Sequence, residues 1–396
     1  MIVSRRTLLA GAAATFVAGA GAAATPDIVA MLDAAAAERD PASALALLSP
    51  LDARGLPPGL AFDLAAARSG LALDAALADV KGAARYPLQL KRMLGDDASP
   101  DAARTRLEAE LSRLLGRADR LFRRLGDTQD GIGARYSRLW RDGRYLYPDS
   151  EPGRARAVAD MNATLGRFRA MLPAAFAPLP PTCLNVSVRA LTPEEIAAGK
   201  GGYRILPEAG RPGFYVVDLK EIGRRPSWTL PSAVAHELLP GHMIQLPLAE
   251  AARPHPLRLR YTPAYAEGWA IHAEELAGRL GTFADPRHEL GHIHWLLFRV
   301  TRGLVDLGIR QGGWSAAEAR SRLVGWMGEP AYFALFDPDL ERTARDPAIR
   351  TAEAMTWLAI ADRSRDLRGA ALRGLHTALL ANGPLRSEAI ARMKAA

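Results

Sequence analysis

The most informative segment of this 396-residue chain is Thr229-Leu-Pro-Ser-Ala-Val-Ala-His-Glu-Leu-Leu-Pro-Gly-His-Met-Ile-Gln245. It predicts a single helix, which Thr229 would cap and which would carry Pro231 close to its first turn. His236 and Glu237 are adjacent on this helix, and His242 follows six residues after His236. Two imidazoles and a neighbouring carboxylate are the groups with which a helix binds zinc and activates water.

The spacing of the two histidines differs from the usual H-E-x-x-H, in which residues four apart share one helix face. Six residues along an ideal helix place the rings about 120° apart, too far round to share a metal. Pro240 and Gly241 lie between them. Proline removes a helical hydrogen bond and clashes with the carbonyl of His236, four residues earlier, while glycine tolerates unusual backbone angles. We therefore expect a kink or bulge that brings His236 and His242 together. The alternative is a helix end with two incidental histidines.

Charge and composition argue against a nucleic-acid partner. The formal net charge is +8, but arginines alternate with acidic residues along helical segments such as 104–113 and do not cluster with aromatic residues. This pattern is typical of a solvated surface. Cys183 is the only cysteine, so no intramolecular disulfide can form, and we expect its side chain to be a small buried hydrophobe.

Residues 1–24 have the pattern of an export signal. Ser4-Arg5-Arg6-Thr7-Leu8-Leu9 looks like a twin-arginine signal, and a weakly apolar run ends in Ala22-Ala23-Ala24, a small-residue cleavage site. A transmembrane anchor is the alternative, but the run is short and rich in Ala and Gly, and no later segment suits a membrane span. We expect a periplasmic or secreted protein without stable membrane insertion after signal cleavage. Residues 25–396 would form a single catalytic domain, with a helical scaffold (25–180) and a metal-site half (181–396).

The pattern before residue 173 is helical, and Ser99-Pro100 predicts the start of a helix that extends to about residue 125. Three segments then predict strands: 184–190 alternates, 213–219 is β-branched and aromatic, and 201–206 is a weaker third. We expect a small antiparallel sheet before the metal-binding helix. An edge strand there would hold an extended peptide by main-chain hydrogen bonds, with ordinary structural packing as the alternative.

A second helix, beginning near Thr262-Pro263, supplies a third candidate ligand. Glu267 follows His242 by 25 residues, and a distant carboxylate is the usual completion of a His2Glu zinc site with one open position. Glu274 lies two turns further on the same face and is suited to orienting a ligand histidine. The alternative is that both glutamates are solvated. Further along, Arg302 and Asp306 are four residues apart and would pair with each other.

Together these motifs resemble the bacterial family called domain of unknown function 885, whose members look like zincin-type metallopeptidases. The pattern H-E-x-x-P-G-H stands here at 236–242, E-G-W-A at 267–270 with a later glutamate at 274, and R-x-x-x-D-x-G at 302–308. The resemblance is weak from about residue 86 and clear from about residue 180 to the C-terminus.

The chain departs from the family pattern at several positions. Arg310 stands where members often have His, and His272 and Trp357 stand where Tyr is usual. The usual F-H-D is Leu-His-Thr at 375–377. The metal ligands and the base implied by the resemblance are retained, whereas groups expected to contact a substrate or an oxyanion are changed.

We therefore predict a mainly α, zincin-like protein with a small antiparallel β element before the metal-binding helix. His236, His242 and Glu267 would hold Zn2+, and Glu237 would be the general base for hydrolysis of an amide bond in a peptide or small amide. The alternatives are a catalytically inactive binding protein with the same fold and a zinc hydrolase of a non-peptide amide or ester. The oligomeric state is left open. The weaker candidates for stabilising an oxyanion are Tyr265, His272, Arg310 and His376.

Overall fold

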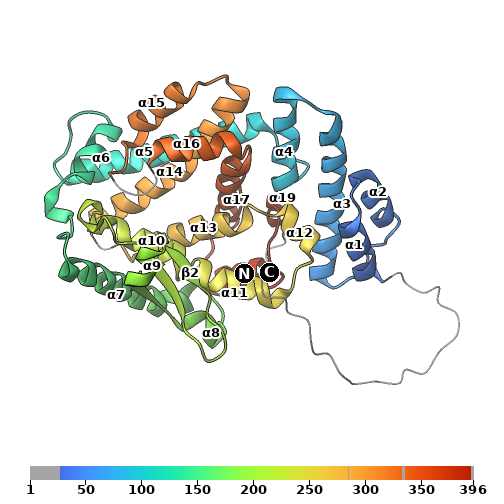
Figure 1. Ribbon diagram of the computed structural model, residues 1–396, viewed down its shortest axis with the longest axis horizontal. Coiled ribbons are helices and arrows are strands. Elements are labelled where there is room, and N and C mark those ends of the chain that lie inside the picture. The colour runs from blue at the N-terminus through green and yellow to red at the C-terminus, as the bar shows by residue number, and fades with distance from the viewer. Residues whose placement is uncertain (1–26, 284, 332–334, 394–396) are drawn as a thin grey trace.

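The computed structural model describes residues 27–283, 285–331 and 335–393, so the predicted export signal lies outside the described residues. The described chain is mainly helical and contains one small sheet, as predicted (Figure 1). Within these residues no helix is both long enough and apolar enough to cross a bilayer. Cys183 is buried, also as predicted.

The residues that precede the sheet form helices and short 3₁₀ turns. Ser99 caps one of these helices by accepting a hydrogen bond from the backbone N–H of Ala102 at 3.1 Å, and Pro100 lies in its first turn, as predicted. The helices are α1 (Ile28–Ala37), α2 (Pro41–Leu48), α3 (Pro58–Asp79), α4 (Arg85–Leu94), α5 (Pro100–Arg124), α6 (Ile132–Trp140), α7 (Glu151–Ala175) and α8 (Pro181–Leu184).

The sheet forms where it was predicted, but its pairing is mixed rather than antiparallel. Its strands are β1 (Val186–Ala190), β2 (Tyr203–Ile205) and β3 (Gly213–Val217), in the order β1-β3-β2. β2 and β3 are antiparallel, whereas β1 runs parallel to β3. The chain between β1 and β3 contains α9 (Pro193–Ala197) and β2 and is long enough to return to the same end of the sheet, which parallel pairing requires. The prediction of antiparallel pairing was therefore wrong for β1.

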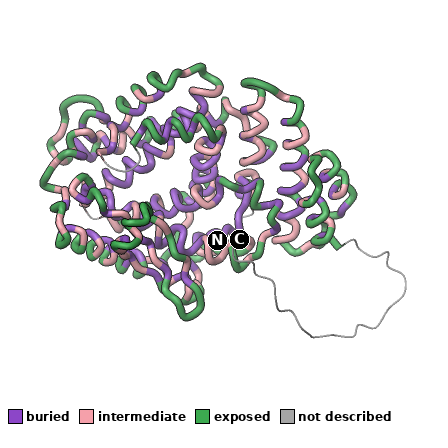
Figure 2. The backbone as a smooth tube through the Cα atoms, in the orientation of Figure 1, coloured by how far each residue is buried: buried purple, intermediate pink, exposed green. Residues whose placement is uncertain are grey.

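Three long helices after the sheet form the centre of the molecule: α13 (Tyr265–Arg279), α14 (Pro286–Gln311) and α17 (Ile349–Ser364). α13 packs along α17, and α14 packs against α5 and α17. Buried residues run along these central helices in Figure 2, as expected for helices enclosed by neighbours. The remaining helices are α10 (Leu230–Glu237), α11 (His242–Ala252), α12 (Pro256–Tyr261), α15 (Ala316–Met327), α16 (Phe336–Arg345), α18 (Gly369–Leu380) and α19 (Ser387–Arg392).

The apolar core consists of separate clusters. One cluster surrounds α5, α14 and α17, and a second joins α7, the sheet, α10 and α13. A third holds α1, α2 and α3 against α12. Helices α13 and α17 contribute buried residues to both of the first two clusters and so join them.

Arg302 and Asp306 do not pair with each other, so that prediction was wrong. Nε of Arg302 lies 3.0 Å from the carboxylate of Asp339 on α16. Asp306 accepts hydrogen bonds from the backbone N–H groups of Ala348 at 3.2 Å and Thr351 at 3.3 Å, at the start of α17. A surface pair four residues apart on a helix is worth only about 0.2–0.5 kcal/mol, and buried charges need stronger partners than that. Tertiary contacts therefore decide the partners of both side chains.

We predict that Gly268→Ala destabilises the protein by about 1–3 kcal/mol, because overpacking forces side chains or backbone to move. Gly268 lies where α13 approaches α17, and an added Cβ would lie 2.6 Å from Cγ2 of Thr356. Equilibrium unfolding in urea measures the change. Gly166→Ala, at an exposed position of α7 where an added Cβ meets nothing within 4 Å, is the control and should be neutral or stabilising by up to about 1 kcal/mol. Equal stabilities of the two variants would contradict the close packing.

Candidate metal centre

The segment that was predicted as one kinked helix is divided into two helices. α10 ends at Glu237 and α11 begins at His242. Pro231 lies in the first turn of α10, as predicted, but Thr229 makes no side-chain cap. Its hydroxyl donates instead to the carbonyl of Pro226 at 2.7 Å, because a 3₁₀ turn at 227–229 leads directly into α10.

The break between the two helices brings the histidine rings together. Gly241 packs so tightly against the end of α10 that an added Cβ would lie 1.9 Å from the carbonyl oxygen of His236. Every other residue has a Cβ, so this contact requires glycine. The rings of His236 and His242 lie 4.9 Å apart between centroids, at 88° to each other. The break at Pro240 and Gly241 thus compensates for the two residues by which this motif is longer than H-E-x-x-H.

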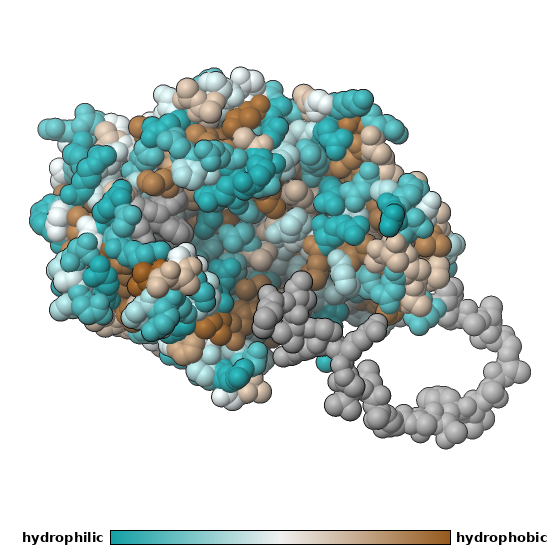
Figure 3. Space-filling view, viewed as in Figure 1, coloured by the Kyte–Doolittle hydropathy of each residue, from teal (hydrophilic) through white to brown (hydrophobic). Residues whose placement is uncertain are grey.

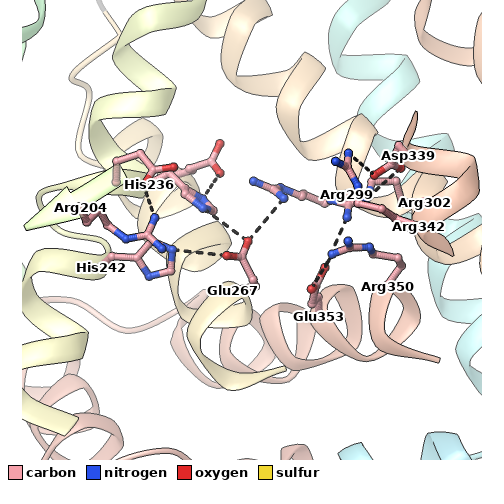
Figure 4. Close-up of polar contacts among 12 residues, drawn as sticks. Arg204, His236, His242, Glu267, Arg299, Arg302, Asp339, Arg342, Arg350 and Glu353 are labelled. Atoms are coloured by element: carbon pink, nitrogen blue, oxygen red, sulfur yellow. Dashed lines mark hydrogen bonds and ion pairs between the residues drawn. The ribbon is translucent and has the colours of Figure 1, made fainter. Parts of the chain in front are cut away.

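Glu267 on α13 lies opposite the two histidines (Figure 4). Its Oε2 is 3.5 Å from Nε2 of His236, and its Oε1 is 3.5 Å from Nε2 of His242. One donor atom from each of the three residues lies within 4.8 Å of the others. The structure therefore brings together the three residues that were predicted as metal ligands, from α10, α11 and α13.

Glu274 orients His236 from behind, in the role that the sequence suggested. Its Oε1 lies 2.8 Å from Nδ1 of His236, and its Oε2 accepts a hydrogen bond from the hydroxyl of Ser232 at 2.5 Å. A carboxylate bound to Nδ1 leaves Nε2 as the nitrogen available to a ligand. Ser232 was not recognised from the sequence, although its position one turn before His236 on the same helix face is a signal that identifies it.

The carboxylates create a negative potential at His236. Burial lowers the pKa of His236, but the charge of Glu267 and the hydrogen bond to Glu274 outweigh burial and raise that pKa to about 9. Burial raises the pKa of Glu267, but His236 and Arg299 hold it well below its ordinary value. The pKa of His242 is lowered, first by burial and also by the charge of His236. A site that favours a proton on one imidazole to this extent also favours a metal cation.

The residues fit a zinc ion. Within the part of the chain that the structure describes, neither ring nitrogen of His242 has a hydrogen-bond partner, although the residue is only 1% exposed. A buried polar group without a partner is unfavourable, and a cation beside Nε2 removes that penalty for one nitrogen. Two imidazoles and one carboxylate are a usual donor set of catalytic zinc, with the fourth position left for water or substrate.

Glu237 lines two cavities. Each has a volume of about 570 Å³, a size typical of small-molecule sites. One passes His236 and Glu267 and continues to α14, α16 and α17, and the other follows β2 and β3. The face drawn in Figure 3 is hollowed near its centre, and hydrophilic residues line the hollow.

Arg204, on the edge strand β2, forms an ion pair with the carboxylate of Glu237. Burial raises the pKa of Glu237, but the charges of His236 and Arg204 outweigh burial and lower that pKa. Sequence reasoning did not identify Arg204 as a site residue, although it lies in the segment 201–206 that was predicted as a strand. Arg299, which contacts Glu267 at 3.5 Å, was also missed.

The four residues considered for stabilising an oxyanion do not line the cavity beside His236. His272 and His376 contact each other in the interior, with 3.0 Å between their Nε2 atoms. The hydroxyl of Tyr265 donates to a backbone carbonyl of α18 at 2.5 Å, and Arg310 donates to a backbone carbonyl of α16. These side chains are engaged in packing and hydrogen bonds between helices.

Comparison with known proteins gives the family. Residues 6–388 match the family described as "Bacterial protein of unknown function (DUF885)". The chain belongs to this family. The match spans all three motifs, and no curated protein matches the chain.

Two solved structures share the fold. One is "the putative lipoprotein from Colwellia psychrerythraea", which is 24% identical with a TM-score of 0.68, over 92% of this chain and 68% of that one. The other is "a putative lipoprotein of unknown function from Shewanella oneidensis", which is 15% identical with a TM-score of 0.63, over 93% of this chain and 73% of that one. At these identities the likeness establishes the fold alone.

We predict that Glu274→Gln lowers the affinity for zinc about 10–100-fold, because the substitution removes the charge that orients and polarises His236. Competition with a chromophoric chelator measures the affinity. His242→Ala removes a ligand and should abolish most of the binding. Glu250→Gln, which removes one carboxylate from an exposed position of α11, is the charge-matched control and should leave the affinity unchanged. Identical affinities of the Glu274 and Glu250 variants would show that Glu274 does not support the site.

Proposed function

We propose that the protein is a zinc-dependent hydrolase that cleaves peptide amide bonds. The observation that carries the proposal is the placement of His236, His242 and Glu267 around one point, with Glu237 beside them on the wall of the cavity. These are the groups that a metal-dependent hydrolase needs: ligands for the cation and a carboxylate base within reach of the same space.

Each of these residues has a role that follows from its position. A bound zinc ion would polarise the scissile carbonyl and lower the pKa of water. The carboxylate of Glu237 takes the proton from the attacking water and passes it to the leaving amine. Glu274 holds the ring of His236 in place, and the ion pair with Arg204 restrains the carboxylate of Glu237.

The arrangement of the cavities supports a peptide as the substrate. Glu237 lines both cavities, so a chain that crosses it has space on either side of the bond to be cleaved. The second cavity follows β2, which is an edge strand of the sheet. An edge strand pairs with an extended peptide through main-chain hydrogen bonds.

The departures from the family pattern do not favour a protein that only binds. His272, Arg310 and Trp357 do not line the cavity beside His236, and Nε1 of Trp357 donates to the carboxylate of Glu275 at 2.9 Å. The residues required for hydrolysis are therefore separate from the positions at which the chain has changed.

We predict that Glu237→Gln lowers the rate of peptide hydrolysis by about 10²–10⁴-fold, because the amide cannot accept a proton. Zinc content should stay the same, because Glu237 is not among the three residues that we propose as ligands. Digestion of a peptide library at neutral pH, with and without chelator, followed by mass spectrometry, measures activity alongside the metal content. Glu250→Gln is the control and should retain full activity.

The possible outcomes distinguish the roles of Glu237. Loss of zinc together with activity would make Glu237 a ligand or a structural support. Equal trace activity in the wild type and in Glu237→Gln would contradict a hydrolase and favour a binding protein.

We also propose that the protein is exported. Each of the two similar structures is named a "putative lipoprotein", and residues 1–24 of this chain have the twin-arginine pattern at Arg5 and Arg6. Changing both residues to lysine should leave uncleaved precursor in the cytoplasm, because the pair itself is the recognised signal. Fractionation and immunoblotting of cells that express the full chain measure this. An unchanged amount of periplasmic protein would contradict the twin-arginine assignment.

A further inference from the structure

Beyond the metal centre, the first cavity is bounded by arginines from three helices (Figure 4). Two carboxylates, Asp339 and Glu353, lie among them. This part of the cavity is called the arginine wall below. Its arginines are Arg299 and Arg302 from α14, Arg342 from α16 and Arg350 from α17.

Three of the four arginines share the two carboxylates. Asp339 contacts Arg302 at 3.0 Å and Arg342 at 3.3 Å. Glu353 contacts Arg350 at 2.9 Å and Arg302 at 4.0 Å. The wall therefore carries more positive than negative charge before Arg299 is considered.

Arg299 is the arginine of the wall that contacts the metal centre. Its Nη1 lies 3.5 Å from Oε2 of Glu267, the same oxygen that lies 3.5 Å from Nε2 of His236. Among the described residues its Nε is buried without a hydrogen-bond partner. A guanidinium group offers five N–H donors in a planar fork that matches a carboxylate. Glu267 is shared with the histidines and cannot satisfy these donors alone.

The arginine wall is held in place by buried contacts. Arg302 is 5% exposed, and Asp339 is 2% exposed. The start of α17, which carries Arg350 and Glu353, is fixed by the hydrogen bonds to Asp306.

Arg342, whose side chain is 45% exposed, is solvated, and the buried Arg302 is paired with Asp339. The donors of Arg299 that Glu267 leaves unsatisfied are therefore the groups of the wall that need an anionic partner. Because the surrounding contacts fix their position, these donors bind an anion well.

We propose that the arginine wall binds a carboxylate group of the substrate and that Arg299 is the residue that contacts it. This inference rests on the proposed function, because the shared oxygen of Glu267 places Arg299 directly beside the metal centre. The carboxylate belongs either to the C-terminus of a peptide or to an Asp or Glu side chain near the cleaved bond. Both present the same group to a guanidinium, so the experiment separates them.

The test measures binding in zinc-loaded mature protein with Glu237→Gln, which suppresses turnover. Calorimetric titrations use three probes: acetyl-Ala-Ala-Ala with a free C-terminus, its C-terminal amide, and acetyl-Ala-Asp-Ala amide. We expect at least one carboxylate probe to bind about 10–100-fold more tightly than the neutral amide, as for a charge-assisted bidentate contact. The carboxylate probe that binds more tightly than the neutral amide identifies the source of the carboxylate. Equal affinities, or no measurable binding of either carboxylate probe, would overturn the proposal.

A second substitution tests Arg299 itself. Adding Arg299→Gln should remove the preference for the carboxylate probe and leave the affinity for the amide and the zinc content unchanged. Arg299→Lys, which keeps the charge but not the fork, should restore part of the preference. Arg156→Gln, at a side chain that is 73% exposed on α7, removes the same charge elsewhere and is the control. If Arg299→Gln lowers zinc content and weakens all probes equally, Arg299 only supports Glu267, and its proposed contact is wrong.

Failure of this inference is distinguishable from failure of the proposed function. Peptide hydrolysis by the wild type without any preference for a carboxylate would retain the hydrolase and reject the subsite. Carboxylate binding that depends on Arg299, with no hydrolysis by the wild type, would retain the subsite and reject the hydrolase.

Discussion

The close approach of Gly241 to the carbonyl of His236 is the contact on which the site depends. The Cβ of any other residue at this position would lie 1.9 Å from that oxygen. The chain between α10 and α11 could then not adopt this conformation. Without the break, a regular helix would point His242 away from His236. Glu267 would then face one histidine in place of two. The close packing of Gly241 against His236 therefore determines whether the three candidate ligands come together.

Helix α14 connects this centre to the rest of the cavity. Arg299 contacts Glu267 at the metal centre, and Arg302, one turn later, extends the arginine wall to Asp339 on α16. Asp306 fixes the start of α17. The motif at 302–308 thus supplies Arg302 to the arginine wall and Asp306 to the hydrogen bonds that hold the start of α17. Because buried charges are tolerated only when they are paired, the contacts of Arg302 with Asp339 and Glu353 also hold α14, α16 and α17 together.

Local signals predicted much of the fold. The helix beginning at Ser99-Pro100 and the location of the small sheet followed from short-range rules of capping and alternation, and both are present. Errors arose where distant segments compete. β1 pairs in parallel with β3. Arg302 contacts α16 and Asp306 contacts α17, and the two side chains do not pair with each other. Periodicity within one segment contains no information about such partners.

The sequence by itself determined the chemical identity of the candidate site, because ligand types and helix breakers are properties of the residues. His236, Glu237, His242, Glu267 and Glu274 were all identified in this way. The packing of distant segments decided that Ser232 bonds to Glu274, that Arg204 pairs with Glu237, and that Arg299 joins the arginine wall to the metal centre. Arginine is common along this chain, and a surface arginine has the same local sequence as one that faces a cavity. Which of the two it becomes depends on how helices far apart in sequence pack together.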